Sequence, residues 1–276
     1  MRQPFPTTSV QPARSADVRP RVSAIVPARD ESECITAVVL GLLALRDPHG
    51  RPCIDEVVVA DNGSRDDTAM QARAAGARVV DARPAGYGMA CWAGVQASQG
   101  DWLLFVDGDG AADAHDAPAL LQALADGADL AIGLRVRPDP HAFTAPQRFG
   151  NALACALMRR IWRMPAHDLG PHRAIRRHAF DALDMRDRAF GWTVEMQVRA
   201  HLQGLRVAQL PVHWRARIGG RSKISGTVRG VIGAGLGIVG MVARLWWRER
   251  QRRAGRLVSS PVRAVIAPAH EFNCKE

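Results

Sequence analysis

The stretch WLLFVDGDGAADAHDAPALLQAL, residues 102–124, decides the fold. It begins with an apolar run of strand length and continues through two aspartates, each followed by glycine. Its last part has apolar residues that recur every three or four positions, which is typical of a helix. Asp-Gly pairs are common in hairpin turns, but a hairpin would continue as a second alternating strand. A strand followed by a helix instead predicts a βαβ unit.

The same alternation extends on both sides of this stretch. Apolar runs of strand length occupy residues 22–28, 54–61, 77–82, 102–107 and 129–134, and helical patterns fill 31–46, 66–77, 88–100 and 116–128. This rhythm predicts an α/β fold with a Rossmann-like, mainly parallel sheet flanked by helices. Ligands bind such sheets at the carboxyl ends of the strands, so the residues that follow the runs are the first candidates for function.

The rhythm changes after residue 134. A loop at 135–147 leads to a helix near 148–163, a loop at 164–174, a helix at 191–204 and a strand-like run at 206–214. We expect this half to complete the acceptor side of one catalytic domain over residues 21–218. A flexible segment without an apolar signal region is expected at 1–20, a basic loop and helix at 219–253, and a loosely ordered tail at 254–276.

Composition limits the partners and the compartment. The net charge of +10 favours anionic partners such as nucleic acid, lipid headgroups or phosphorylated substrates, without choosing among them. The five cysteines form no CxxC pair, which argues against a disulfide framework and a zinc knuckle and fits a reducing cytoplasm. The sequence makes no prediction of oligomeric state.

A charge-free stretch covers residues 230–243. As a helix it would be about 21 Å long, too short for a hydrocarbon core of roughly 30 Å. The basic segment RLWWRERQRR, residues 244–253, follows it with two adjacent tryptophans. Two interpretations stay open: an interfacial helix on the inner face of the cell membrane, or a core helix with a solvated basic end.

Asp107 and Asp109 follow the fourth strand directly. Two carboxylates at the end of a buried strand must face a cation or repel each other. Mg²⁺ and Mn²⁺ prefer oxygen ligands and take phosphate oxygens to complete their shell. The pair therefore predicts a metal site, with a polar turn as the alternative.

Polar residues also follow the other strands. Asp30 and Glu31 come after the first, where a helix N-terminus alone would favour carboxylates. Asp61 and Asn62 come after the second, at a position where acidic side chains bind a ribose or base. The third strand leads to Gly86, Tyr87 and Gly88 at the start of a helix, where free N–H groups would suit a phosphate, unless the glycines form an ordinary turn. Ser64 and Asp67 have the spacing of a capping box.

Seven segments in order resemble family 2 inverting glycosyltransferases of the GT-A fold, within them most the dolichyl- or polyprenyl-phosphate hexosyltransferases. They cover residues 22–229 and read VSAIVPARDE, VVVADNGSRDDT, AGYGMACWAG, FVDGDGAAD, HDLGPHRAI, GWTVEMQVRA and RARIGGRSKISGT. The resemblance implies a nucleotide-sugar donor and a metal near Asp107 and Asp109. It also implies a set of residues that line the nucleotide-sugar donor: Pro27, Asp30, Glu31, Asp61, Asn62, Gly86, Gly88 and Asp107. Ala111 stands where some members have glutamine, and Tyr87 where many have lysine.

The chemistry of sugar transfer suggests further candidates. A bound cation neutralises charge on the departing diphosphate. A phosphate monoester acceptor is already ionised at neutral pH, whereas a hydroxyl acceptor needs a carboxylate to take its proton. Asp168 and Glu195 are the candidate carboxylates, mainly by resemblance. For phosphate charge we expect Arg217, Arg221 and Lys223, the last being one of only two lysines in the chain.

The sequence thus predicts a metal-dependent glycosyltransferase that moves a hexose from a nucleotide diphosphate sugar to a polyprenyl phosphate. An enzymatic alternative uses a hydroxyl of a glycan or lipid acceptor in cell-envelope assembly. A different alternative is a non-catalytic basic protein that binds a membrane or nucleic acid. Nucleic acid is not expected as a partner, because the arginines are spread through the chain without an aromatic stacking pattern.

Overall fold

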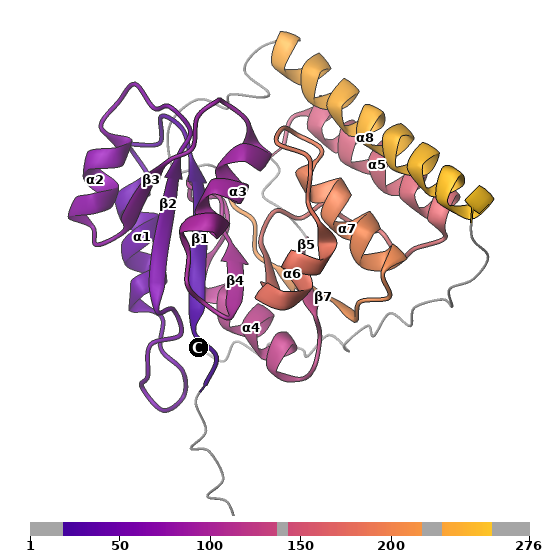
Figure 1. The fold of residues 1–276 in the computed structure, drawn as a ribbon. Helices are drawn as coiled ribbons and strands as arrows, with labels where there is room; N and C mark the ends of the chain where they lie inside the picture. Colours follow the sequence, from indigo (N-terminus) through magenta and orange to yellow (C-terminus); the bar gives the residue numbers. More distant parts are fainter. Residues whose placement is uncertain (1–18, 137–142, 217–227, 256–276) are drawn as a thin grey trace, which may run out of the picture.

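The computed structural model describes residues 19–136, 143–216 and 228–255, with side chains in the last range from 237 to 251. Its centre is a seven-stranded sheet in the order β3-β2-β1-β4-β6-β5-β7 (Figure 1). All neighbouring strands are parallel except where β6 lies antiparallel to both β4 and β5. The strands are β1 Val22–Ala28, β2 Glu56–Asp61, β3 Arg78–Asp81, β4 Trp102–Phe105, β5 Leu130–Arg135, β6 Arg173–Arg176 and β7 Val207–Val212.

Helices cover both faces of this sheet because its strands are apolar on both sides. In β1, Ala24 and Val26 pack toward one core cluster and Ile25 toward the other, as the alternation of side chains along a strand requires. The first cluster includes α1 and α4, and the second includes α3, α6 and α7. The helices are α1 Ile35–Ala44, α2 Thr68–Ala74, α3 Tyr87–Ala97, α4 Ala117–Ala125 after the short η1 Ala114–Asp116, α5 Ala145–Trp162, α6 Arg177–Leu183, α7 Trp192–Leu202 and α8 Val228–Gly255.

A third apolar cluster joins α5, α7 and α8 beyond the sheet. Figure 1 shows α8, in yellow-orange, running alongside α5. Met241, Val242 and Leu245 of α8 are buried in this cluster, while Trp246 and Trp247 are exposed. The core-helix interpretation is therefore correct for one side of α8, and its outward side carries the tryptophan pair. Among the described helices, none is long and apolar enough to cross a bilayer.

The five predicted strands of the first half, the four helices between them and the mainly parallel sheet are confirmed. The second half differs at β6 and α6, which the sequence did not predict. The loop expected at 164–174 ends in β6, which enters the sheet between β4 and β5. The segments predicted as flexible or loosely ordered lie largely outside the described residues; Arg19, at the edge of the first, pairs with Asp55 at 2.7 Å.

Candidate active site

The predicted site residues of β1, β2 and β4 meet at the carboxyl edge of the sheet. Ala28 at the end of β1 lies opposite Asp61 at the end of β2. On the other side, the N–H of Gly108 donates to the carbonyl of Pro27 at 3.4 Å, so the segment after β4 runs beside the end of β1. The structure thus brings Pro27, Asp61 and Asp107 to one edge, as the parallel arrangement predicts.

Asp30 and Asp61 are held in place by a network between two loops. Asp30 has a left-handed backbone (φ 49°), its N–H donates to Ser64 Oγ at 2.9 Å, and its Oδ1 accepts from the N–H of Arg65 at 2.7 Å. Asp61 Oδ1 accepts from both the N–H and the hydroxyl of Ser64. The capping box predicted for Ser64 and Asp67 is therefore wrong, because the Ser64 hydroxyl binds Asp61 and α2 has no side-chain cap.

Glu31 and Asn62 are both buried next to these loops. The N–H of Glu31 donates to Thr68 Oγ1 at 2.8 Å. The amide of Asn62 donates to the carbonyl of Ala82 at 2.5 Å and accepts from the N–H of Gly86 at 2.7 Å. Asn62 therefore fixes the connection between β3 and α3, a structural role that its place after a strand does not reveal.

The glycines at the start of α3 face protein backbone. A Cβ on Gly88 would lie 2.6 Å from the carbonyl oxygen of Asp187, and one on Gly86 would collide with the carbonyl of Arg188. The N–H of Gly88 donates to the carbonyl of Ala189 at 3.0 Å, and the next N–H, of Met89, is also engaged. The prediction that these N–H groups are available to a phosphate is therefore wrong, because the Gly88 N–H binds the 187–189 segment and the Gly86 N–H binds Asn62 Oδ1.

A cavity of about 440 Å³ opens beside the end of β4. Tyr87, Asp107, Arg135 and Asp168 are among the residues that line it. Its apolar walls include residues from α8 and from the loops around it, namely Phe143, Leu169, Pro171, Phe190 and Ile238. The size is typical of a small-molecule site, and the mixture of apolar walls with a few charged groups is typical as well.

Within this cavity, Tyr87 donates its hydroxyl hydrogen bond to Asp107 Oδ1 at 3.0 Å. Burial, and then the charge of Asp107, raise the pKa of Tyr87 well above 10, so the phenol stays protonated and remains a donor. Asp109 Oδ1 accepts from the N–H of Ala111 at 3.0 Å, and Ala111 is itself buried. Tyr87 therefore orients one of the two carboxylates predicted to hold a metal.

The donor set at Asp107 and Asp109 fits a hard divalent ion, since both side chains offer carboxylate oxygens and both are partly exposed. Over the described part of the chain, no group of three or more His, Cys, Asp or Glu residues is suited to hold a metal. An ion at this pair would need ligands from a bound phosphate or from water, as Mg²⁺ usually does.

Asp168 is buried and bound on several sides by Arg135. Its Oδ2 accepts from Arg135 Nε at 2.7 Å and from the N–H of Arg135 at 3.0 Å, and its Oδ1 accepts from Arg135 Nη2 at 2.5 Å. Burial alone would raise the pKa of Asp168, but the hydrogen bonds and charge of Arg135 outweigh burial and lower it below 3.8. The guanidinium carbon of Arg135 also lies 4.6 Å from the ring centre of Phe143 and 5.3 Å from that of Trp214. Asp168 is thus a negatively charged carboxylate whose charge is compensated by Arg135, and this makes it a weak proton acceptor.

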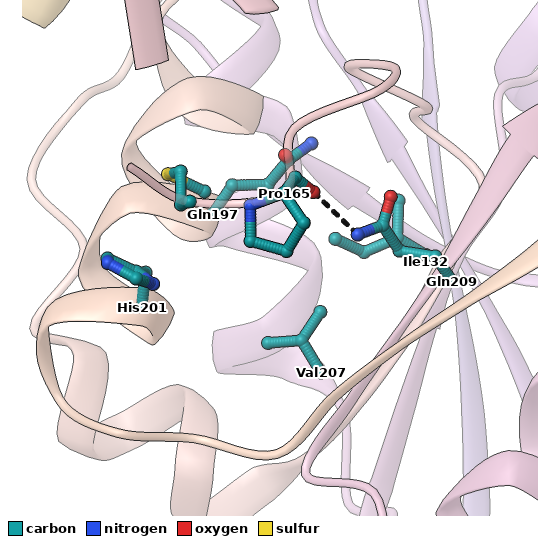
Figure 2. Close-up of a pocket in the computed structure, with 7 residues that line it drawn as sticks. Ile132, Pro165, Gln197, His201, Val207 and Gln209 are labelled. Atoms are coloured by element: carbon teal, nitrogen blue, oxygen red, sulfur yellow. Dashed lines mark hydrogen bonds between the residues drawn. The ribbon is translucent and has the colours of Figure 1, made fainter. Parts of the chain in front are cut away.

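A second cavity, of about 30 Å³, is lined by residues of β5, α7 and β7 and by Pro165 (Figure 2). Gln209 Nε2 donates to the carbonyl of Pro165 at 2.6 Å, the dashed line in Figure 2. Gln197, which lines the same space, donates to the carbonyl of Asp168 at 2.9 Å. Since this cavity has room for only about one or two waters, its lining serves to hold the loop that carries Asp168.

Glu195 is fully buried and does not line the larger cavity. Its Oε1 accepts from Arg199 Nε at 2.8 Å, and its Oε2 accepts from the N–H groups of Arg186 and Asp187 at 3.0 and 2.6 Å. This carboxylate therefore anchors the segment that packs on Gly86 and Gly88, and it does not reach the cavity.

The three basic residues predicted to gather phosphate charge, Arg217, Arg221 and Lys223, lie outside the described residues. The chain just before them is placed close to the metal candidates. The N–H of Arg215 donates to the carbonyl of Ala111 at 2.9 Å, and the Arg215 guanidinium pairs with Asp113. Trp214 forms an isolated bridge with Ala112. The described chain up to Ala216 thus runs beside the residues that follow the DGDG turn.

The sequence did not single out Arg135, Phe143, Asn151 or Ile238 as site residues. Arg135 had a usable signal, because it ends the fifth strand at the functional edge of the sheet. Asn151 and Ile238, which also line the cavity, had none, because their place there depends on how α5 and α8 pack.

Comparison with known proteins identifies relatives of this chain and of its fold. The glycosyl transferase family 2 profile matches residues 23–183. An uncharacterized glycosyltransferase of Mycobacterium tuberculosis is 37% identical over 211 residues, which is 76% of this chain and 93% of that protein. A dolichyl-phosphate hexose transferase of Haloferax volcanii is 30% identical over 165 residues, 59% of this chain and 72% of that protein. The crystal structure of glucosyl-3-phosphoglycerate synthase from Mycobacterium tuberculosis, in complex with Mn²⁺, UDP and glucosyl-3-phosphoglycerate, superposes with a TM-score of 0.63 at 21% identity, covering 81% of this chain and 80% of that one.

The fold is therefore the GT-A fold of glycosyltransferases, a mainly parallel sheet that here carries carboxylates at its carboxyl edge near a substrate-sized cavity. More particularly, the chain belongs to glycosyl transferase family 2, whose profile matches more than half of it.

Proposed function

We propose that this enzyme moves a hexose from a nucleotide diphosphate sugar to a polyprenyl phosphate, with inversion, on the cytoplasmic face of the cell membrane. The observation that carries the choice of acceptor is the state of the two candidate bases. Asp168 is neutralised by Arg135 and Glu195 by Arg199, so neither is poised to take a proton. A phosphate monoester attacks without a base because it is already ionised at neutral pH. The Haloferax relative, by its name a dolichyl-phosphate hexose transferase, supports the same acceptor class.

On the donor side, we infer that Asp107 and Asp109 hold Mg²⁺ or Mn²⁺ together with the donor's diphosphate. When bound, such an ion neutralises the charge that develops on the leaving diphosphate. The mycobacterial synthase, crystallised with Mn²⁺ and UDP, supports a divalent ion and a nucleotide donor. Pro27, Asp30, Glu31 and Asp61 stand at the same edge of the sheet and are proposed to bind the nucleoside.

On the acceptor side, Arg217, Arg221 and Lys223 are proposed to gather the phosphate charge, and the bridge of Trp214 to Ala112, shortly before them in the chain, supports this. Arginine can bind two phosphate oxygens at once, and lysine acts as a point charge. The apolar wall formed by Phe143, Phe190 and Ile238 suits the first isoprene units of a lipid acceptor.

A second candidate function keeps the donor and uses a hydroxyl acceptor on a glycan or lipid. It is favoured by one observation, that the Asp168 carboxylate lines the cavity even though Arg135 binds it. A mechanism of this kind would require the Arg135 pair to open when the acceptor binds.

The test is a transfer assay with purified protein, a panel of nucleotide sugars, Mn²⁺, and two acceptors that differ only in the phosphate: a polyprenyl phosphate and the matching polyprenol. We expect product only with the phosphate, and no loss of rate at mildly acidic pH beyond ionisation of that phosphate near pH 6. Equal transfer to the polyprenol would favour the hydroxyl mechanism, as would loss of transfer in Asp168→Asn with donor binding intact.

A further inference from the structure

Helices α5 and α8 each have one buried side and one outward side that is unusually apolar. Met241, Val242 and Leu245 of α8 are buried, whereas Trp246 and Trp247 on its other side are 43% and 59% exposed. On α5, Phe149 is 69% exposed and Leu153 is 36% exposed. The helical repeat explains the division, since residues three and four apart share a side. We call the exposed residues Phe149, Leu153, Val239, Trp246 and Trp247, with the arginines around them, the outer face.

The charge on the outer face is almost entirely positive. Arg148 and Arg160 of α5 and Arg244 and Arg250 of α8 are exposed. The guanidinium carbon of Arg250 lies 5.5 Å from the ring centre of Trp246. The sequence of α5 contains no acidic residue, and that of α8 contains only Glu249. Two copies of this face would bring like charges together, so a symmetric dimer is disfavoured and an anionic partner is favoured.

Aromatic side chains mixed with arginine are the composition that suits the boundary of an anionic bilayer. Tryptophan has an apolar ring with one polar N–H and accumulates at the level of the lipid headgroups. Arginine side chains bury their apolar stems while the guanidinium reaches the phosphates. Nucleic acid would need stacking aromatics along a charged groove, whereas these aromatics stand on convex helix surfaces.

The outer face also adjoins the cavity. Arg148 and Gly150 line the cavity on either side of the exposed Phe149. Ile238 lines it next to the exposed Val239. Both helices therefore contribute neighbouring residues to the cavity wall and to the outer face, so a surface that covers this face also borders the cavity.

From this arrangement we propose that the outer face of α5 and α8 docks on an anionic lipid bilayer and sets the cavity beside the headgroups. The docking itself is inferred from the exposed residues alone. Docking would let a lipid phosphate enter the cavity without leaving the bilayer, and this second step rests on the proposed function.

The experiment is sedimentation of the full chain with vesicles of phosphatidylcholine, alone or mixed with phosphatidylglycerol, without donor or acceptor. We expect binding to the mixed vesicles that weakens with salt and is at least about tenfold weaker on neutral vesicles. Phe149→Ser/Leu153→Ser and Trp246→Ala/Trp247→Ala are each expected to lower the partition coefficient about tenfold or more, because each removes large apolar side chains from the contact. Met70→Ser is the control, since Met70 on α2 is 60% exposed and lies on another part of the molecule.

Three results would overturn the proposal: unchanged binding in both double variants, equal binding to neutral and anionic vesicles, or a dimer in solution that the double variants abolish. The last would assign the face to a second copy. Two double variants on separate helices guard against the misfolding of one, and calorimetric donor binding checks that each site is intact. Vesicle binding without transfer to any polyprenyl phosphate would refute the proposed function and leave the docking standing, so the two failures are distinguishable.

Discussion

Replacement of Tyr87 by phenylalanine removes one oxygen atom from the proposed metal site and nothing else from its shape. The Tyr87 hydroxyl donates to Asp107 Oδ1 at 3.0 Å, and its raised pKa keeps the proton on the phenol throughout the working range of pH. A hydrogen bond to a charged group is worth about 1.5–3 kcal/mol, and tenfold in affinity corresponds to about 1.4 kcal/mol. If this bond orients Asp107 for the ion, Tyr87→Phe is expected to weaken Mn²⁺ binding about tenfold to a hundredfold, the range found when partners of metal ligands are removed.

The assay is calorimetric titration of Mn²⁺ into the protein with a nucleoside diphosphate present. Thr193→Val is the matched control, because it removes a hydroxyl from another wall of the same cavity. A second readout needs no turnover: Tyr87 is the only tyrosine in the chain, so protein labelled with ¹³C-tyrosine has one tyrosine ring signal, which should shift when the ion binds. Mn²⁺ affinity that is equal or higher in Tyr87→Phe, together with an unmoved ring signal in the wild type under Mg²⁺, would refute the orienting role.

The remaining predictions concern stability and are checked by urea unfolding. Gly88→Ala should cost about 1–3 kcal/mol, because its Cβ would lie 2.6 Å from a backbone carbonyl, whereas Gly150→Ala in α5 meets nothing within 4 Å and should stabilise by about 0.5–1 kcal/mol. Burial lowers the pKa of His172 from 6.5 to about 4, so between these pH values the unfolded chain binds one proton more than the folded chain. The free energy of unfolding should therefore fall by about 3 kcal/mol through this residue as the pH drops from 6.5 to 4. His172→Leu should reduce this dependence on pH. Asp168→Asn should cost about 3 kcal/mol, because it leaves the Arg135 guanidinium, whose side chain is only 14% exposed, without its counter-ion. Equal stability of the two glycine variants, a wild-type slope retained in His172→Leu, or an unchanged Asp168→Asn would contradict the respective reasoning.

The first half of the fold was predictable because apolar runs of strand length alternate there with helical patterns, so even the four-residue β3, which has charged ends, follows from its place in the alternation. Strand β6 was not, since it is equally short, begins and ends in arginine, and lies where this alternation has stopped. Arg173 can be fully buried in this strand because it donates hydrogen bonds to the backbone carbonyls of Leu169, Gly170 and Thr193. A sequence does not show which backbone carbonyls will accept from a given arginine.

The candidate site was predictable to the level of strand ends and no further. Because parallel strands end at the same edge of a sheet, the sequence placed Asp30, Asp61 and Asp107 at one edge, and the structure has them there. It could not tell a glycine that approaches a ligand from one that approaches a backbone carbonyl about a hundred residues away, as at Gly88. Nor could it show that Asp168 has an arginine partner 33 positions earlier, a contact between the loop after α5 and the end of strand β5.

Asp107 and Asp109 are proposed to hold a metal ion that binds the donor. Calorimetry of nucleotide sugars with and without Mn²⁺, on the wild type and on Asp107→Asn/Asp109→Asn, tests this proposal most directly. We predict donor binding that requires the ion in the wild type and is lost in the double variant, with an unchanged melting temperature. Donor binding that is independent of Mn²⁺, or equal in the two proteins, would contradict the account.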